Sequence, residues 1–398
     1  MLFSFSPKSS TLLIFFVHGL VYAFLLLKKG FDDQNTPSKY LGTFLLLCVL
    51  YICPFMLGYA GWYSTRGHPD IMFFVPFQQL FLIGPIFYFY TQSLLNKSFK
   101  PAGKDFLHFL PAILYLIFSL IVFVTDKLIL DEYYFYADGR DMDLDPWYQW
   151  AGLFSMLFYL ILSLRYYRTY RNLAYQVTSY ADAILFQWLQ RFLLAFLLIL
   201  ILRILFFILN PEWGQFGNKY WYYICFSLLF YYIAINGYSS TIKSSLSFQT
   251  SFLHNEKVML LDEKEKHEIK SLPATEDAKS GIEDLREWKQ KLEDLMIRGN
   301  LYENPRLSLI DISAKLDTTP KQVSQIVNQG FQKNFNDFVN QFRTEALIQK
   351  LQNGDHQKQT LLSLALEVGF NSKSTFNRAF KKHSGLTPRE FLQKLEDK

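Results

Sequence analysis

The chain has 398 residues, of which 51% are hydrophobic and 18% aromatic, and it carries 40 Lys and Arg against 35 Asp and Glu. This length allows two or three domains, and this apolar content argues against a protein that is water-soluble throughout. Charge is unevenly distributed, because residues 1–238 contain 16 basic and 13 acidic side chains whereas residues 239–398 contain 24 and 22. The composition therefore predicts an apolar N-terminal part and a water-exposed C-terminal part.

Seven apolar runs in the N-terminal part are candidate membrane spans, because a bilayer core requires about 20 consecutive apolar residues per helix. They are approximately Thr11–Leu27, Tyr40–Gly61, Ile71–Leu95, Phe106–Thr125, Trp147–Leu164, Gln187–Leu209 and Tyr220–Tyr238. Pro76 and Pro85 in the third run predict a kinked or broken helix.

The basic residues of the connecting loops predict how this bundle is oriented. With seven spans and the N-terminus outside, the inside loops carry nine basic residues and the outside segments five, which agrees with the positive-inside rule. The inside set is Lys28, Lys29, Lys39, Lys97, Lys100, Lys104, Arg165, Arg168 and Arg171; the outside set is Lys8, Arg66, Lys127, Arg140 and Lys219. This orientation places residues 239–398 in the cytoplasm.

A few polar residues of this part have candidate roles. Arg203 in the sixth run is either a functional intramembrane charge or a side chain that extends to the nearby interface. Gln78, Gln79, His18 and His108 are expected to form interhelical hydrogen bonds. The acidic loop 126–146 is expected to be exposed to solvent.

Residues 239–281 change to a Ser-rich and then mixed-charge composition with Pro273 and Gly281, which is typical of a flexible or partly helical tether. A helix with one apolar face is predicted next, over residues 282–299. That face is suited either to pairing two protomers or to packing on its own domain.

Two helix-turn-helix units are predicted at about 308–329 and 360–383. In the first, a short helix precedes a turn at residues 317–318, and Thr319 and Pro320 suit the N-cap and first position of the second helix. In the second, Gly369 suits the turn and Ser372 caps the following helix. A helix from Phe335 to Gln352 separates the units and spans about 27 Å.

The outward faces of the two second helices hold the candidate DNA-binding side chains, while Val323, Ile326, Phe376 and Phe380 face inward. The candidates are Lys321, Gln322, Gln325, Asn328, Lys373, Ser374, Asn377, Arg378 and Lys381. Arg pairs bidentately with guanine, and Gln or Asn with adenine, so Arg378 and Lys321 lead this set. Residues 306–398 contain 14 basic and 9 acidic side chains, an excess suited to phosphate contacts.

The stretch "LALEVGFNSKSTFNRAFKKHSGLTPREF" resembles the C-terminal signature of the AraC/XylS family of bacterial transcription regulators, and the similarity extends over residues 300–395. Its matching positions are Ala365, Gly369, Phe370, Ser372, Ser374, Phe376, Arg378, Phe380, Lys381, Lys382, Gly385, Thr387 and Pro388. The resemblance implies a double helix-turn-helix DNA-binding fold. Departures are Ser313, Thr375 in place of the usual aromatic, and Phe391–Leu392; of these, Thr375 is expected to alter a DNA contact.

We therefore expect an all-α chain with a seven-helix transmembrane bundle (1–238), a cytoplasmic linker (239–281) and an AraC-like DNA-binding domain (282–398). The expected function is that of a one-component transcription regulator embedded in a bacterial inner membrane. It would sense a small-molecule or membrane-borne signal and bind double-stranded DNA, as a homodimer.

An alternative is a membrane receptor or transporter whose helical tail recruits a protein. An enzyme is not expected, because the sequence has no glycine-rich nucleotide loop, no His-Glu-x-x-His motif and no serine nucleophile elbow. No catalytic residue, metal site or cofactor is predicted.

Overall fold

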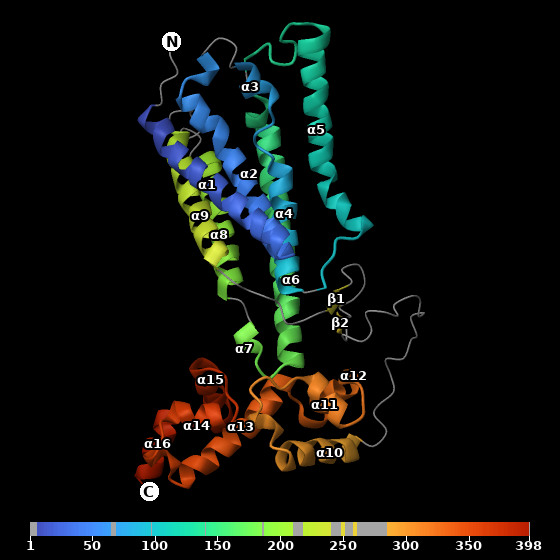
Figure 1. Ribbon diagram of the computed structural model, residues 1–398, viewed down its shortest axis with the longest axis vertical. Coiled ribbons are helices and arrows are strands. Elements are labelled where there is room, and N and C mark those ends of the chain that lie inside the picture. Colours follow the sequence, from blue (N-terminus) through green and yellow to red (C-terminus); the bar gives the residue numbers. More distant parts are fainter. Residues whose placement is uncertain are drawn as a thin grey trace. The chain divides into compact units, whose positions relative to one another are not determined.

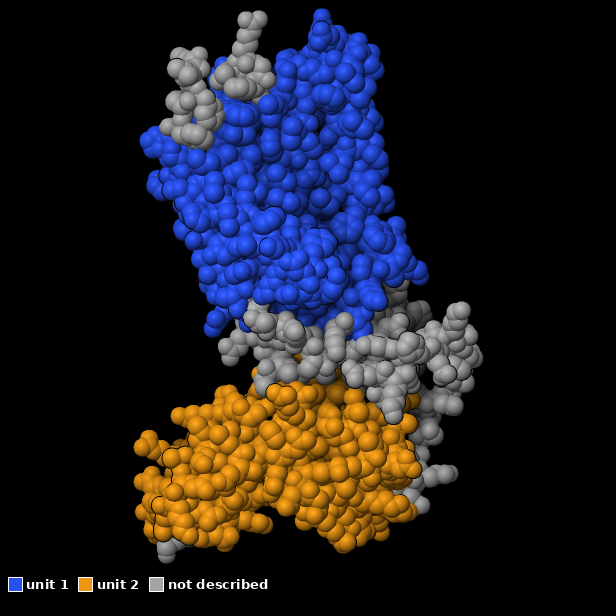
Figure 2. Space-filling view, viewed as in Figure 1, with its two compact units in different colours: residues 1–167, 186–248 blue, residues 168–185, 249–398 orange. Residues whose placement is uncertain are grey.

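The computed structural model describes residues 6–64, 69–96, 98–139, 141–184, 187–209, 218–239, 248–250, 258–260 and 285–397. The chain divides into two compact units, which are unit 1 (residues 1–167 and 186–248) and unit 2 (residues 168–185 and 249–398) (Figure 2). The expected all-α fold is confirmed, with one minor two-stranded sheet of β1 (Phe248–Thr250) and β2 (Val258–Leu260). Most of the predicted linker, 239–281, lies outside the described residues.

Unit 1 is a bundle of long helices (Figure 1). Its helices are α1 (Pro7–Asp32), α2 (Thr36–Tyr59), α3 (Pro69–Phe74), α4 (Leu80–Leu95), α5 (Leu110–Phe123), most of α6 (Pro146–Val177), α8 (Gln187–Ile204) and α9 (Lys219–Ser239). Short turns of helix flank them at Trp62–Ser64, Gly103–Phe109, Val124–Ile129, Met142–Leu144 and Leu205–Leu209. Each of the seven predicted runs contains helix. The third is broken between α3 and α4, where Pro76 lies, whereas Pro85 lies inside the continuous helix α4.

Several helices of unit 1 are suited to a lipid environment. Among the residues that the structure describes, five helices are long and apolar enough to cross a membrane, namely Pro7–Asp32, Thr36–Tyr59, Gly103–Ile129, Pro146–Val177 and Trp188–Leu209. Four of them, all except Thr36–Tyr59, expose large apolar side chains, such as Ile14, Phe24, Leu114, Leu120, Phe154, Phe158, Leu194 and Ile201. Contiguous apolar surface of this kind is unfavourable in water and favourable against lipid tails.

A buried polar cluster connects the break between α3 and α4 to α6 and α8. Gln78 is fully buried, its N–H donates to Asp143 at 2.9 Å, and its side-chain oxygen accepts from Gln149 at 2.8 Å. Arg203 donates to the Gln149 side chain at 2.7 Å and to the Gln149 carbonyl at 2.9 Å. Arg203 is thus 3% exposed and hydrogen-bonded inside the unit, which contradicts the alternative in which its side chain extends to the interface.

The acidic loop is also less exposed than its composition predicted, because Asp126, Asp141 and Asp143 are buried. Tyr63 donates to Asp141 at 2.9 Å, and Tyr115 donates to Asp143. Burial raises the pKa of Asp141 to about 7, with the nearby Asp143 adding to the effect, and burial raises the pKa of Asp143 to about 6. The acidic composition of the loop predicted exposure, but these carboxyl groups form hydrogen bonds with distant residues and are therefore buried.

These raised pKa values predict that unit 1 becomes less stable as the pH rises. A carboxyl group whose pKa is higher in the folded state binds its proton more tightly there than in the unfolded chain. The stabilisation is therefore complete below about pH 4 and is lost as the pH rises through about 7, where Asp141 ionises. We expect the melting temperature of unit 1 in detergent to fall between pH 5 and pH 8, and Asp141→Asn to reduce that slope. Asp131→Asn, at an exposed position of the same loop, is the matched control and should leave the slope unchanged.

Unit 2 contains α7 (Ala181–Ile184), α10 (Leu285–Arg298), α11 (Leu309–Lys315), α12 (Pro320–Gln325), α13 (Phe335–Gln352), α14 (Leu361–Glu367), α15 (Lys373–Ser384) and α16 (Pro388–Glu396). A π-helical turn, Ile326–Gly330, extends α12, and single turns lie at Leu301–Glu303 and Asp355–Gln357. Within this unit α13 lies between the pair α11–α12 and the pair α14–α15 (Figure 1). On α10, Leu292 and Met296 are fully buried in unit 2, so its apolar face packs on its own domain.

The C-terminal end of α6 and the turn after it, residues 168–184, belong to unit 2. The Ser179 N–H donates to the Leu307 carbonyl at 3.0 Å, and Thr178 forms a β-bridge with Ser308. The Asn336 side chain donates to the Thr178 carbonyl at 3.3 Å. The sequence assigned these residues to the loop between the fifth and sixth spans and gave no indication of this docking.

Arg343 on α13 is fully buried and joins three parts of unit 2. Its Nε donates to the Tyr302 carbonyl at 2.8 Å and its Nη2 to the Asn304 carbonyl at 2.7 Å. Towards the docked turn, Nη1 and Nη2 donate to the Ser179 carbonyl and hydroxyl at 3.3 and 3.1 Å, and Nη1 also reaches Asn340 at 3.1 Å. Burial lowers the pKa of Arg343 to about 9, so the side chain stays charged at neutral pH.

We expect Arg343→Met to destabilise unit 2 by about 3 kcal/mol or more, because it leaves buried carbonyl oxygens without donors. The free energy of unfolding is measured on the full-length protein in detergent, by urea titration with pulse proteolysis of residues 285–397. Arg306→Met, at an exposed position, is the control and should change the free energy by less than about 0.5 kcal/mol. Equal effects of the two substitutions would contradict the linking role of Arg343.

Candidate nucleic-acid interface

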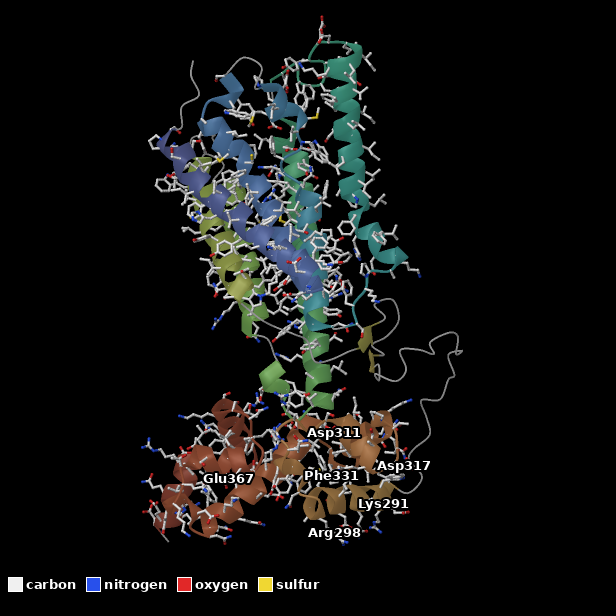
Figure 3. All side chains as sticks on the ribbon, viewed as in Figure 1. Lys291, Arg298, Asp311, Asp317, Phe331 and Glu367 are labelled. Atoms are coloured by element: carbon white, nitrogen blue, oxygen red, sulfur yellow. The ribbon has the colours of Figure 1, made fainter. Side chains whose placement is uncertain are left out.

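The first helix pair is held by local capping interactions. Ser308 caps α11, where the Ser308 N–H donates to Asp311 at 2.8 Å and the Ser308 hydroxyl accepts from the Asp311 N–H at 3.4 Å. The turn after α11 contains Asp317, which is labelled in Figure 3. Its φ of +50° is left-handed. Thr319 then caps α12 by accepting from the Gln322 N–H, with Pro320 at the first helical position, as predicted.

The second pair repeats this arrangement with a different turn. Thr360 caps α14 and Ser372 caps α15, each accepting a backbone N–H three residues later. Gly369 in the turn has φ of +97°, a conformation that costs glycine little. Leu364, Phe370, Phe376 and Phe380 form a common core with Leu347 of α13. The predicted inward faces of both pairs are confirmed, since Val323, Ile326, Phe376 and Phe380 are 3% exposed or less.

Of the predicted site residues on the first pair, Lys321 and Asn328 are exposed, and Gln322 and Gln325 are half-buried. Gln322 accepts a hydrogen bond from the Thr318 hydroxyl, and Asn328 donates to Ser324 at 3.3 Å. On the second pair, Lys373, Ser374, Asn377, Arg378 and Lys381 are all exposed. The two sets thus lie on the outward sides of α12 with its extension and of α15, as the helical pattern predicted.

Arg378 differs from the other predicted residues because its guanidinium is already occupied. Its Nη1 donates to Asp182 Oδ1 at 2.7 Å, and its Nη2 is paired with Asp182 Oδ2. Thr375, which is 1% exposed, donates to Asp182 Oδ2 at 3.0 Å. Thr375 was expected to alter a DNA contact; in the structure its hydroxyl binds a carboxylate of the same chain.

Asp182 is the functional candidate that the sequence reasoning missed. One signal was available, because Asp182 is the only acidic residue between Asp145 and Glu212. A lone carboxylate in a loop otherwise rich in Tyr and Arg indicates a specific partner, but its partner lies 196 residues away in the sequence. Pattern alone does not pair two positions at such a separation.

Two short helices joined by a tight turn, with buried apolar sides and an exposed polar second helix, define the helix-turn-helix class of DNA-binding domains. Residues 312–394 match the family model described as a helix-turn-helix domain, and this match is of the AraC type. No curated protein and no solved structure gives a significant match to the chain. The chain therefore has an AraC-type helix-turn-helix domain at its C-terminal end, which is a domain of DNA-binding transcription regulators. Its N-terminal helices are apolar enough to span a membrane.

The turn between α14 and α15 yields a stability prediction. A Cβ on Gly369 would lie 2.2 Å from the Tyr302 carbonyl oxygen and 2.8 Å from that of Glu303, whereas a Cβ on Gly354, also at positive φ, would meet nothing within 4 Å. We expect Gly354→Ala to cost about 1 kcal/mol from backbone strain alone. Gly369→Ala should cost roughly 1–3 kcal/mol more, because the carbonyl that approaches it also accepts from Arg343. Equal losses in urea unfolding would mean that residues 302–303 move aside without cost.

Proposed function

We propose that the protein is a membrane-embedded one-component transcription regulator that binds promoter DNA through both helix pairs and senses its signal through the membrane unit. The observation that carries this proposal is the pair of outward polar faces, on α12 and on α15, presented by one unit whose residues 312–394 match a DNA-binding family. The domain limits proposed are a membrane sensor of seven spans over 1–238, a linker over 239–281 and a DNA-binding domain over 282–398.

The proposed contacts divide by chemistry. Lys321, Lys373 and Lys381 bind phosphate, and their removal reduces affinity on all sequences. Gln322, Gln325, Asn328, Ser374 and Asn377 read base edges in the major groove, as does Arg378 once its guanidinium is free. The length of α13, about 27 Å, is of the order of the spacing between successive major grooves on one face of DNA, about 34 Å.

The membrane unit supplies the sensing part of the proposal. Its cluster of buried Gln78, Asp143 and Arg203 with half-buried Gln149 joins a helix break to two other helices. Buried polar groups are costly inside a membrane protein and mark functional positions there. A signal that alters this cluster changes the positions of helix ends, and α6 continues from unit 1 into unit 2.

The predicted orientation, with the N-terminus outside and the C-terminal unit in the cytoplasm of a bacterium, gives unit 2 access to DNA. We further propose that two protomers bind one operator, because linking four helix pairs raises the apparent affinity without new contacts. The alternative, a receptor or transporter whose helical tail recruits a protein, requires no affinity for DNA.

Salt-dependent DNA binding tests this function on the full-length protein in lipid nanodiscs. Bound fragments are selected from genomic DNA, and the best one is titrated between 50 and 200 mM salt. We expect Lys381→Ala to weaken binding to all sequences and to reduce the salt slope by about 1. Asn377→Ala should weaken binding to the selected sequence by about 1–3 kcal/mol and leave non-specific binding unchanged.

Lys394→Ala on α16 is the matched control, because it removes the same charge from an exposed position outside the proposed face. The proposal is contradicted if Lys381→Ala and Lys394→Ala have equal effects, or if the wild type shows no DNA binding at any salt concentration. The second result, in combination with capture of a protein by unit 2, would favour the recruitment alternative.

A further inference from the structure

We propose that the segment 168–184 is a built-in competitor of DNA, in which Asp182 occupies Arg378 and holds the face of α15 in a non-binding state until the segment is withdrawn. The inference rests on the proposed function, because it names the regulation of the same DNA-binding face. All the residues concerned lie within unit 2, and Arg378 is the one among them that was predicted to contact DNA.

Both oxygens of the Asp182 carboxylate are engaged with the start of α15 and with the end of α6. Oδ1 accepts from Arg378 Nη1 and from the Tyr175 hydroxyl, each at 2.7 Å, and Oδ2 accepts from Thr375 at 3.0 Å and from Arg378 Nη2. The Tyr175 hydroxyl also accepts from Arg378 Nη1 at 3.3 Å, and the Arg378 Cζ lies 5.7 Å from the centre of the Tyr175 ring. The Asp182 side chain is 15% exposed, so this is a partly enclosed contact of four groups.

The contact of Arg378 with Asp182 competes with its use on DNA. A guanidinium binds a carboxylate, the O6 and N7 of guanine, or a phosphate through the same fork of two N–H groups. Both Nη atoms of Arg378 are directed at Asp182, so the fork is not available for a second bidentate acceptor. The carboxylate also places a negative charge where a DNA phosphate would approach α15, and like charges repel.

An isolated surface ion pair contributes little, at about 0–1 kcal/mol, and would not hold a segment in place. Here the contact is supported by an independent anchor at Thr178 and Ser179, which bind Leu307, Asn336 and the buried Arg343. Asp182 follows this anchor by three residues, so its effective concentration at Arg378 is high. The anchor lies on α13 and the 307–308 strand-like segment, whereas the contact of Asp182 is with α15, so Asp182 can separate from Arg378 while the anchor persists.

The position of the segment in the chain indicates what withdraws it. It connects α6 to α8, and the helices Pro146–Val177 and Trp188–Leu209 are both long and apolar enough to cross a membrane. A signal that shifts either helix end therefore acts on residues 178–184 through the covalent chain, with no diffusible intermediate. DNA and the membrane signal are then linked, because whatever favours separation of Asp182 from Arg378 favours binding of DNA by the same factor.

The test compares DNA affinity of full-length variants in nanodiscs without added signal, with a DNA fragment selected as above and labelled for fluorescence anisotropy. Asp182→Asn keeps the size of the side chain and removes its charge, and it should tighten DNA binding by about 5-fold or more. Tyr175→Phe removes only the hydroxyl that supports the contact, and it should tighten binding by a smaller factor. Asp294→Asn on α10 removes the same charge from a side chain that is 49% exposed and should leave the affinity unchanged.

The outcomes separate this inference from the proposed function. Tighter binding by Asp182→Asn, with Asp294→Asn equal to wild type, supports the competitor, and loss of folding does not produce such a gain. Wild-type binding that Asp182→Asn leaves unchanged or weakens overturns the competitor and leaves the regulator intact, since Asp182 would then be irrelevant or would orient Arg378 for DNA. Absence of DNA binding in the wild type, Asp182→Asn and Tyr175→Phe alike overturns both.

Hydrogen exchange provides a second readout that does not depend on the affinity. Amides of residues 180–184 should exchange faster when the selected DNA is added to the wild type, because DNA displaces Asp182. The Ser179 amide, which is bonded to the Leu307 carbonyl, should remain protected. Unchanged exchange across 180–184 at saturating DNA would overturn the competitor even if the affinities had shifted.

Discussion

Unit 2 depends on the burial of one guanidinium. Arg343 has no contact with water, and a charge in that position is tolerable only when nearly every donor has an acceptor. Five hydrogen bonds meet this requirement, and their acceptors come from α13, from the loop at 302–304 and from the turn at Ser179. Because the guanidinium is planar and rigid, these three segments must keep a fixed arrangement. The Arg343 Cζ also lies 5.9 Å from the centre of the Phe370 ring, which ties the second helix pair to the same point.

This constraint explains why a loop between two apolar helices belongs to the DNA-binding unit. Without Ser179, two of the Arg343 nitrogens would lose acceptors in a site from which water is excluded. The loop is therefore part of the folded structure of unit 2 and not an accessory to it. Docking of this loop also brings Asp182 to Arg378. The hydrogen-bonding requirement of the buried Arg343 thus places a carboxylate where it can regulate Arg378.

Unit 1 is suited to a lipid environment, in contrast to the water-exposed unit 2. Its outer faces present apolar side chains, and its interior contains Gln78, Gln149 and Arg203, which are hydrogen-bonded to one another and to the acidic loop. In a lipid environment this distribution is favourable, because polar groups that face lipid are costly and those that face one another are not. In the proposed function, the combination of such a unit with a DNA-binding unit connects a membrane event to a promoter without a separate messenger.

The sequence by itself determined the local features of the structure, which depend on residues close to one another in the chain. The helix from Phe335 to Gln352, the Thr319 and Ser372 caps, the positive φ of Gly369 and the break in the third apolar run were all predicted, because each is a property of a few consecutive residues. Only the tertiary structure decided which polar groups are buried and what they bind. Asp143 was expected near solvent, Arg203 either as an intramembrane functional charge or at the interface, and Thr375 as a residue that alters a DNA contact. Asp182 was not among the predicted site residues. The physical reason is that a hydrogen bond fixes the partner's position in space, and the local patterns of propensity and periodicity contain no information about residues far away in the chain.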